Sequence, residues 1–227
     1  MDVVYPLKVH TPSGYQELRY SLRTLRNLPH GRVFLIGGCP SWAKNVVHIP
    51  TDQRFRKYQN LCLNIETACK ADFISDPFII MNDDFMVMQP VGQVEPFWKS
   101  TLDEAIERYA KRPSMANWHA GMLDVQAECE RRGIQDPLSY ELHVPMVVHK
   151  AAMLEALQAI PHGPVWRTIY GNLVGYGGVK RQDIKIADKA RDLPESEYVS
   201  TEDDSFVFGK AGKKIRDRFK AKSPYEI

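Results

Sequence analysis

The sequence predicts an α/β fold with a mainly parallel central sheet and helices on both of its faces. Along residues 3–81, short apolar runs of strand length alternate with longer segments whose apolar residues recur at helical spacing. Glycine and proline end several of these segments, as at Gly37-Gly38 and Pro50. Parallel strands need long crossover connections, and the helices in those connections cover the sheet. In open sheets of this kind, ligands bind beyond the carboxyl ends of the strands.

The first segments follow the order β-α-β-β-α-β. Residues 3–7 are a β-rich run, and residues 15–28 carry leucines three and four apart, which is typical of an amphipathic helix. Ser13 and Gln16 have the spacing of a capping box at the start of this helix. The other segments of this part are strands at residues 32–37, 46–49 and 77–81 and a helix at residues 57–71.

Beyond Pro90 the sequence favours helices, and no linker marks a domain boundary, so we expect a single domain over residues 1–227. Residues 171–178 carry four glycines and are predicted to form a mobile loop. The other predicted segments are helices at residues 95–111, 123–132, 150–160 and 211–221 and an edge strand within residues 195–208.

The composition excludes collagen-like, low-complexity and wholly disordered chains, because 44% of the 227 residues are hydrophobic and 26% are charged. A net charge of +2 argues neither for nor against a nucleic-acid partner. No apolar run approaches the roughly 18 residues that span a bilayer, and the N-terminus does not resemble a secretory signal, so we expect a cytoplasmic protein. Without C-x-x-C or zinc spacing, reduced thiols are expected at Cys39, Cys62, Cys69 and Cys129.

Two adjacent carboxylates, Asp83 and Asp84, follow the apolar strand predicted at residues 77–81. Adjacent side chains on an extended chain point to opposite sides. One carboxylate is thus able to bind Mg²⁺ or Mn²⁺, which prefer hard oxygen ligands, while backbone donors or a basic side chain hold the other. The alternative is that Asn82-Asp83-Asp84 forms a turn through side-chain hydrogen bonds.

A second acidic run, Glu202-Asp203-Asp204, follows another β-rich segment. Either it converges with Asp83 and Asp84 on a metal ion, or each run is a solvated turn. The sequence leaves both interpretations open, because most of the chain separates the two runs.

His143 stands before Val144-Pro145, and the proline biases Val144 toward an extended conformation that places the imidazole at a turn. Histidine titrates near neutral pH, which suits it to take a proton from a hydroxyl or to contact a phosphate. The alternative is a capping or core histidine. Arg167 precedes the glycine-rich segment, and its guanidinium is suited to a diphosphate, although most arginines are surface charges.

The helix predicted at residues 211–221 is strongly basic. Its Lys213, Lys214, Arg216 and Arg218 form a stripe suited to a polyanion such as DNA, a phosphorylated glycan or a lipid surface. The alternative is a solvated helix whose charge balances acidity elsewhere in the chain.

In their order along the chain, these motifs resemble the Stealth family, which comprises capsular-polysaccharide sugar-1-phosphate transferases and the lysosomal-enzyme N-acetylglucosamine-1-phosphotransferase. Residues 15–25, 33–36, 40–42, 64–66 and Met81-Asn82-Asp83-Asp84-Phe85 resemble its second conserved region. His143-Val144-Pro145 with Arg167 resembles the third, and residues 198–204 with 222–226 resemble the fourth. The chain departs from the first region, because Asp2-Val3-Val4-Tyr5 continues as Pro6-Leu7-Lys8 where the family has Thr-Trp-Val.

The resemblance implies a GT-A-like nucleotide-diphospho-sugar transferase fold, in which residues 1–92 bind the nucleotide sugar and residues 93–227 bind the acceptor. It also implies a UDP-sugar donor and Mn²⁺ or Mg²⁺ held by Asp83, Asp84 and Asp203. The implied catalytic residues are Asp84, His143 as proton acceptor or phosphate contact, and Arg167 on the phosphates. The implied donor-binding residues are Tyr5, Arg19, Asn64, Asn82 and Asp83.

We therefore expect a metal-dependent transferase that moves a sugar or a sugar 1-phosphate from a nucleotide-diphosphate sugar to a hydroxyl of a glycan, a protein or another polymer. One alternative is a glycosyltransferase that acts on hydroxymethylated bases in DNA, with the basic stripe as its DNA contact. A second alternative is a non-catalytic module that has kept the fold and binds the nucleotide sugar without turning it over.

Overall fold

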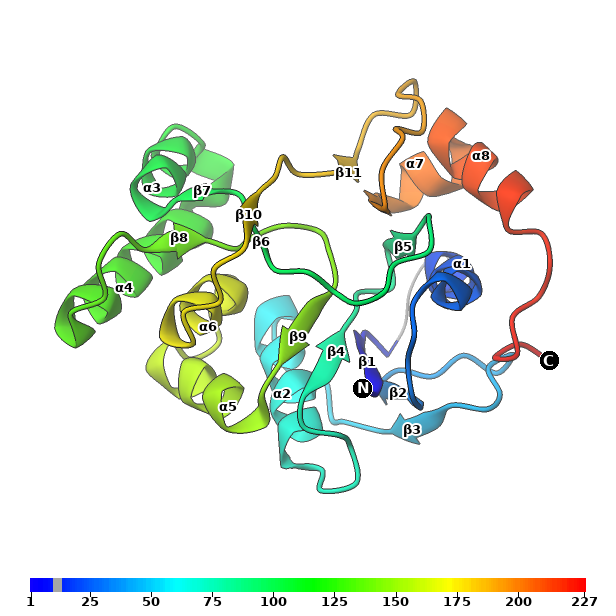
Figure 1. The fold of residues 1–227 in the computed structure, drawn as a ribbon, viewed down its shortest axis with the longest axis horizontal. Coiled ribbons are helices and arrows are strands. Elements are labelled where there is room, and N and C mark those ends of the chain that lie inside the picture. The colour runs from blue at the N-terminus through cyan, green and yellow to red at the C-terminus, as the bar shows by residue number, and fades with distance from the viewer. Residues whose placement is uncertain (10–13) are drawn as a thin grey trace.

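The computed structural model describes residues 1–9 and 14–227, and a five-stranded sheet with the order β3-β2-β1-β4-β9 forms its centre (Figure 1). The strands are β1 (Val3–Leu7), β2 (Val33–Gly37), β3 (Val47–Ile49), β4 (Phe78–Ile80) and β9 (Met146–Val148). β9 is antiparallel to β4, and the other three pairings are parallel. The predicted mainly parallel central sheet is therefore confirmed.

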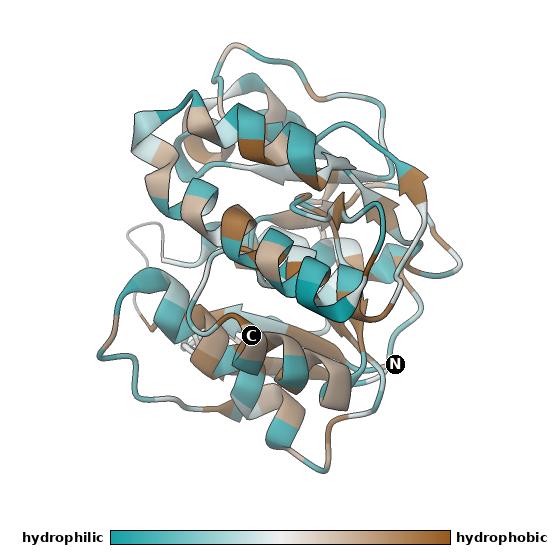
Figure 2. Cartoon of the chain, turned by 90° about the vertical axis from the view of Figure 1, so that its left-hand side faces the viewer, coloured by the Kyte–Doolittle hydropathy of each residue, from teal (hydrophilic) through white to brown (hydrophobic). Residues whose placement is uncertain are grey.

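Helices cover both faces of this sheet, as predicted. The helices are α1 (Gln16–Thr24), α2 (Lys57–Lys70), α3 (Leu102–Ala110), α4 (Ala116–Arg132), α5 (Lys150–Ala159), α6 (Trp166–Leu173), α7 (Asp203–Phe208) and α8 (Lys210–Arg218), with 3₁₀ turns η1 (Leu25–Asn27) and η2 (Pro113–Met115). Successive side chains of β1 enter different cores, because a strand's side chains alternate between faces: Val4 joins the core with α2, and Tyr5 joins the core with α1. Hydrophobic and hydrophilic residues accordingly alternate along the helices in Figure 2.

A second sheet of three strands lies beside the carboxyl end of β4. It has the order β11-β12-β5, with β11 (Lys185–Ile186), β12 (Tyr198–Thr201) and β5 (Phe85–Val87). The edge strand predicted within residues 195–208 is wrong in its position, because β12 lies in the middle of this sheet and the segment then continues as α7. α7 and α8 pack on the sheet through a core that includes Met86, Val199 and Ile215.

The helix predicted at residues 95–111 begins later than expected. It starts at Leu102 because Thr101 forms a capping box with Glu104, and the residues before it form β6 (Phe97–Trp98) and β7 (Ser100–Thr101). These pair with β10 (Val179–Lys180) and β8 (Leu138–Ser139), respectively.

α6 was not predicted, and it takes in the first glycine of the segment interpreted as a loop. Gly171 is required inside this helix, since a Cβ there would lie 2.4 Å from the ring of Tyr140.

The capping box at Ser13 lies outside the described residues, and the helix predicted at residues 15–28 is divided between α1 and η1. All four cysteines are free thiols, as expected. Within the described ranges, no helix is long and apolar enough to cross a membrane.

Candidate functional site

The strand order reverses between β1 and β4, because the chain runs from β1 outward to β2 and β3 and then returns to β4 on the other side. A crevice forms beyond the carboxyl ends of the strands at such a reversal, and it is the usual ligand site of an open α/β sheet. Asn82, Asp83 and Asp84 follow β4 at this point. The sheet therefore brings the predicted acidic motif to the place where ligands bind.

A pocket of about 580 Å³ opens at the carboxyl ends of β1, β2 and β3, and its size suits a small ligand. We call it the switch-point pocket because it lies on the β1 side of the reversal; its lining includes Gly38, Trp42, His48 and Thr51 and no residue from the end of β4. Gly38 is needed there, because a Cβ would lie 2.3 Å from the carbonyl oxygen of Lys8. The walls of the pocket are thus set by close backbone packing at the ends of the strands.

Asp84 is buried and ion-paired. Its Oδ2 lies 2.8 Å from Nζ of Lys185 and accepts a hydrogen bond of 2.7 Å from Oγ of Ser200. Burial alone would raise the pKa of Asp84, but the charge and hydrogen bonds of these partners outweigh it and lower the pKa. One of the two adjacent carboxylates is therefore held by a basic side chain, as predicted, and this pairing argues against Asp84 as a metal ligand.

Asp83 has the opposite character. Burial, and then the negative charges of Asp84 and Asp203, raise its pKa to about 7. Asp203 begins α7, directly beyond the β12 strand that pairs with β5. Asp203 of the second run thus lies close enough to Asp83 to raise its pKa, while Asp204 pairs with Lys189, and convergence of the two runs on a metal ion stays a prediction.

Glu17 of α1 completes an acidic cluster of Glu17, Asp83, Asp84 and Asp203, and no sequence motif had indicated it. The hydroxyl of Thr201 donates a hydrogen bond of 2.5 Å to Glu17, which is 5% exposed. Burial, with a hydrogen bond to Asp203, raises the pKa of Glu17 to about 10. Burial of Glu17 thus favours its protonated form beside Asp203.

Replacing Glu17 with Gln is expected to increase the free energy of unfolding by about 1–3 kcal/mol at pH 7. The pKa of Glu17 is higher in the folded than in the unfolded chain, where it lies near 4.5, so wild-type stability falls as pH rises from 4.5 toward 10. Glutamine has the same shape and needs no proton. Urea unfolding at pH 5 and pH 8 measures the effect, with the exposed Glu195→Gln as the control. Parallel pH profiles for wild type and Glu17→Gln would contradict this assignment.

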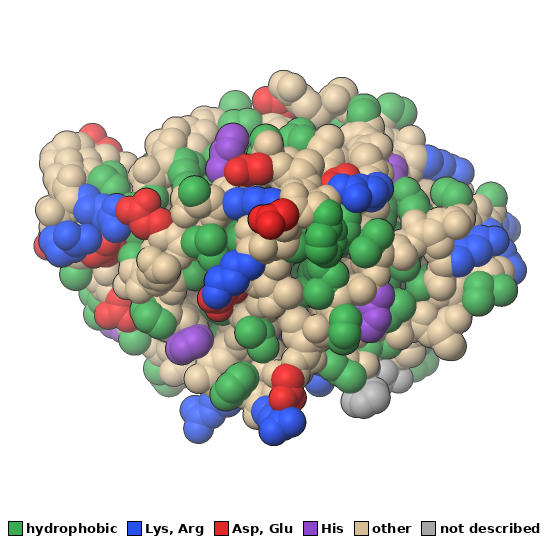
Figure 3. All heavy atoms as spheres, turned by 90° about the horizontal axis from the view of Figure 1, so that it is seen from below, with side chains coloured by type: hydrophobic (Ala, Val, Ile, Leu, Met, Phe, Trp, Pro, Cys, Tyr) green, Lys and Arg blue, Asp and Glu red, His purple; other side chains and the backbone are tan. Residues whose placement is uncertain are grey.

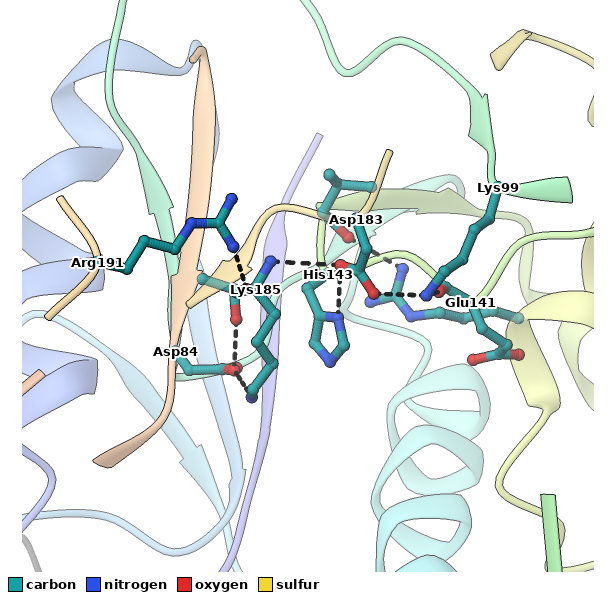
Figure 4. A network of polar contacts seen from close by, with 10 residues as sticks. Asp84, Lys99, Glu141, His143, Asp183, Lys185 and Arg191 are labelled. Atoms are coloured by element: carbon teal, nitrogen blue, oxygen red, sulfur yellow. Dashed lines mark hydrogen bonds and ion pairs between the residues drawn. The ribbon is translucent and has the colours of Figure 1, made fainter. Parts of the chain in front are cut away.

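His143 and Asp183 form a histidine–carboxylate dyad (Figure 4). Nδ1 of His143 lies 2.9 Å from Oδ1 of Asp183, and Nζ of Lys99 lies 2.6 Å from the other oxygen. Burial would raise the pKa of Asp183, but the hydrogen bond and charge of His143, with those of Lys99, hold it well below its usual range. When the imidazole is neutral, the ionised Asp183 accepts the Nδ1 proton and Nε2 is left as a proton acceptor. The imidazole is about one-third exposed and so is accessible to a ligand.

Arg167 lies behind this dyad. It is 5% exposed, its Nη1 donates a hydrogen bond of 2.9 Å to the carbonyl of Val144, and its guanidinium stacks on Phe85 and Trp166. Nearby Glu141 is buried too, and burial raises its pKa to about 7. Arg167 thus positions the segment that carries His143, while its Nη2 has no hydrogen-bond partner among the described residues, and the phosphate contact implied for it stays a prediction.

The structure also buries two of the implied donor-binding residues. Tyr5 is fully buried, with its hydroxyl 2.9 Å from Oγ of Ser21. Asn64 is buried and donates a hydrogen bond to the carbonyl of Leu7 at the end of β1. Both support the strand ends that carry the site, and this burial corrects the prediction that they contact the donor.

Of the two other implied donor-binding residues, Arg19 lies beside the switch-point pocket, and Asn82 lies in the turn after β4. The guanidinium of Arg19 stacks 4.5 Å from the ring centre of Trp42, a pocket residue. Asn82 lies in the turn before β5, where its carbonyl accepts a hydrogen bond from the backbone of Phe85. Their donor contacts stay predictions.

The basic stripe lies on α8, and much of its charge is paired. Lys213 forms an ion pair with Asp217 and Lys214 with Asp192, while Arg216 donates to the carbonyl of Phe206 and Arg218 stacks on Phe219. α8 lies at the top of the molecule in Figure 1, and the face seen from below in Figure 3 carries intermingled positive and negative side chains. A polyanion contact at this stripe stays a prediction.

The resemblance implies Mg²⁺ or Mn²⁺, and the acidic cluster offers the carboxylate oxygens that these ions prefer. Burial first, and then the negative charges of Asp84 and Asp203, raise the pKa of Asp83, and a cation would offset those charges. Mg²⁺ is commonly bound by one or two carboxylates together with substrate phosphates, and Asp83 and Asp203 are the residues that would hold it. Within residues 1–9 and 14–227, no group of three or more His, Cys, Asp or Glu side chains is arranged to hold a metal ion.

Sequence reasoning missed Asp183, Lys185, Lys99, Glu141 and Glu17. The strongest available signal was Asp183-Ile184-Lys185, because residues two apart on an extended segment share a face. The others are isolated charges whose partners lie far away along the chain.

No known family model matches the sequence, and no curated protein was found that matches it.

Proposed function

We propose that the chain is a transferase that takes a nucleotide-diphosphate sugar as donor and moves the sugar, or the sugar 1-phosphate, to an acceptor hydroxyl. The observation that carries this proposal is the position of three groups. The carboxylates of Asp83 and Asp203 and the switch-point pocket lie at the same edge of the central sheet, and the His143–Asp183 dyad lies beside Asp84. The resemblance to the Stealth family supports the same chemistry.

In the proposed reaction, Nε2 of His143 accepts the proton of the attacking hydroxyl. The ring then carries a positive charge, and the ionised Asp183 offsets it across the 2.9 Å hydrogen bond. Lys99 keeps Asp183 ionised through its 2.6 Å ion pair. These three side chains thus move one proton and hold the resulting charge in place.

The leaving group is a nucleoside diphosphate or a nucleoside monophosphate, and both carry negative charge. A divalent cation held by Asp83 and Asp203 would offset that charge. Lys185 fixes Asp84 beside them, so that the strand end keeps its shape when a ligand binds. Whether attack occurs at the anomeric carbon or at phosphorus depends on the position of the acceptor.

The test is to incubate the purified chain with Mn²⁺, a panel of nucleotide sugars and hydroxyl acceptors, and to identify the released nucleotide. Nucleoside diphosphate release indicates sugar transfer or hydrolysis, and monophosphate release indicates sugar-phosphate transfer. Asp83→Asn should reduce release on the order of 100-fold, whereas the exposed Asp217→Asn should not. Equal release by Asp83→Asn and wild type, or an intact donor in every reaction, would reject the proposal.

A further inference from the structure

A second pocket of about 580 Å³ lies over α3, away from the acidic cluster. We call it the α3 pocket. Its cationic lining residues are Lys99, Arg108, Lys111, Arg112 and Lys180, and the lining also includes two glutamates, Glu104 and Glu107. A concave site with this excess of positive charge favours an anionic ligand.

Most of this positive charge is not neutralised by the protein. Of the five cations, Lys180 has an ion pair of 3.7 Å to Glu104 and Lys99 has one of 2.6 Å to Asp183. Arg108, Lys111 and Arg112 have no ion pair with any described residue. Moreover, Nη1 of Arg108 is buried and lacks a hydrogen-bond partner within the described ranges. Buried polar groups are nearly always hydrogen-bonded, so Arg108 has hydrogen-bonding capacity that no described residue uses.

Lys99 connects the α3 pocket to the dyad. It lines the pocket, and its ammonium group contacts Asp183, which in turn holds His143 (Figure 4). In Figure 1, α3 and β3, whose end forms part of the switch-point pocket, lie on opposite sides of the molecule. A ligand in the α3 pocket would thus approach the dyad from the side opposite the donor.

We propose that the α3 pocket binds a phosphate group carried by the acceptor molecule. The assignment of the phosphate to the acceptor rests on the proposed function, whereas the binding of phosphate rests on the α3 pocket alone. Guanidinium groups bind phosphate oxygens in a bidentate manner, and Arg108 and Arg112 supply two of them. The acceptor phosphate is either a monoester of a small molecule or a diester of a polymer, because both present the same oxygens to these side chains.

Calorimetry on the full chain in EDTA tests the proposal with inorganic phosphate, methyl phosphate, dimethyl phosphate and acetate. EDTA removes divalent cations, so the acidic cluster repels these anions. Phosphate is expected to bind, and Arg108→Gln and Arg112→Gln each to weaken binding about tenfold or more. The matched control is the exposed Lys70→Gln on α2, which lies outside the lining of the α3 pocket and should bind as wild type does. Tighter binding of methyl phosphate assigns a monoester, and tighter binding of dimethyl phosphate assigns a diester.

Failure to bind any of the three phosphates, equal binding of acetate, or unchanged binding in both arginine variants would overturn the proposal. Circular dichroism and thermal unfolding of each variant establish that a loss of binding is not a loss of fold. Because the titration contains no donor, it can succeed or fail independently of the nucleotide-release assay for the proposed function.

Discussion

Replacing Asp183 with Asn is expected to lower acceptor-dependent transfer by about 1000-fold while the fold is kept. The reason is the position of Lys99, whose ammonium lies 2.6 Å from one oxygen of Asp183 and is able only to donate hydrogen bonds. The amide oxygen of the introduced asparagine would therefore face Lys99, and its NH₂ group would face Nδ1 of His143. That arrangement moves the ring proton to Nε2, where it blocks the base.

Nucleotide release and product formation, measured at saturating donor, test this expectation. A tautomer defect lowers kcat and leaves the donor KM close to that of wild type, whereas damage to the donor site raises KM. The matched control is Asp192→Asn, because Asp192 also pairs with a lysine but lies on the surface beside α8. If Asp183→Asn kept more than about one-tenth of the wild-type kcat, Asp183 would not orient a catalytic base.

The elements that the sequence predicted are those whose signal is local. The leucines of α1 and the apolar runs of β1, β2 and β4 carry their own periodicity, and the structure confirms them. β6, β7, β8, β10 and β11 have two residues each, which is too short for a hydrophobic pattern. α6 was missed because its Gly171 signals a loop, and only the ring of Tyr140 explains that glycine.

The candidate site divides in the same way. Asp83, Asp84 and His143 stand next to recognisable strands or turns, so the sequence indicated them. Lys99 and Asp183 are 84 residues apart, and Asp84 and Lys185 are 101 residues apart. Such pairings depend on how β5, β11 and β12 assemble, which no local pattern encodes. The burial of Arg167 was likewise not predicted, since exposure cannot be deduced from residue type alone.

Replacing Glu226 with Ala is expected to reduce the free energy of unfolding by about 3–5 kcal/mol. Its side chain is fully buried and accepts hydrogen bonds of 2.8 Å from both Nε and Nη2 of Arg23, in α1. Arg23 also donates to the carbonyl of Phe219, just beyond α8. Removing the carboxylate leaves a buried guanidinium without its counter-charge, and this is the costly outcome for a buried ion pair.

Urea unfolding of Glu226→Ala, Arg23→Met and the double variant separates the ion pair from the surrounding packing. The double variant should be less destabilised than the sum of the two single variants, because neither Arg23 nor Glu226 is then left buried without the other. The exposed pair of Lys213 and Asp217 is the control, and Asp217→Asn should change stability by less than about 0.5 kcal/mol. Additive single effects would show that Arg23 and Glu226 do not act as a pair.

The ion pair of Arg23 and Glu226 also determines how the free energy of unfolding depends on pH. Burial would raise the pKa of Glu226, but Arg23 and the hydrogen bonds from Ser223 lower it below 4.5. A carboxyl group whose pKa is lower in the folded chain contributes stability that is present above its unfolded pKa and is lost as pH falls through the folded value. Wild type should therefore lose this contribution below about pH 4.5, and Glu226→Ala should not. The difference in unfolding free energy between wild type and Glu226→Ala should consequently shrink as the pH falls. A constant difference from pH 7 to pH 3 would show that the charge of the Glu226 carboxylate does not stabilise this contact.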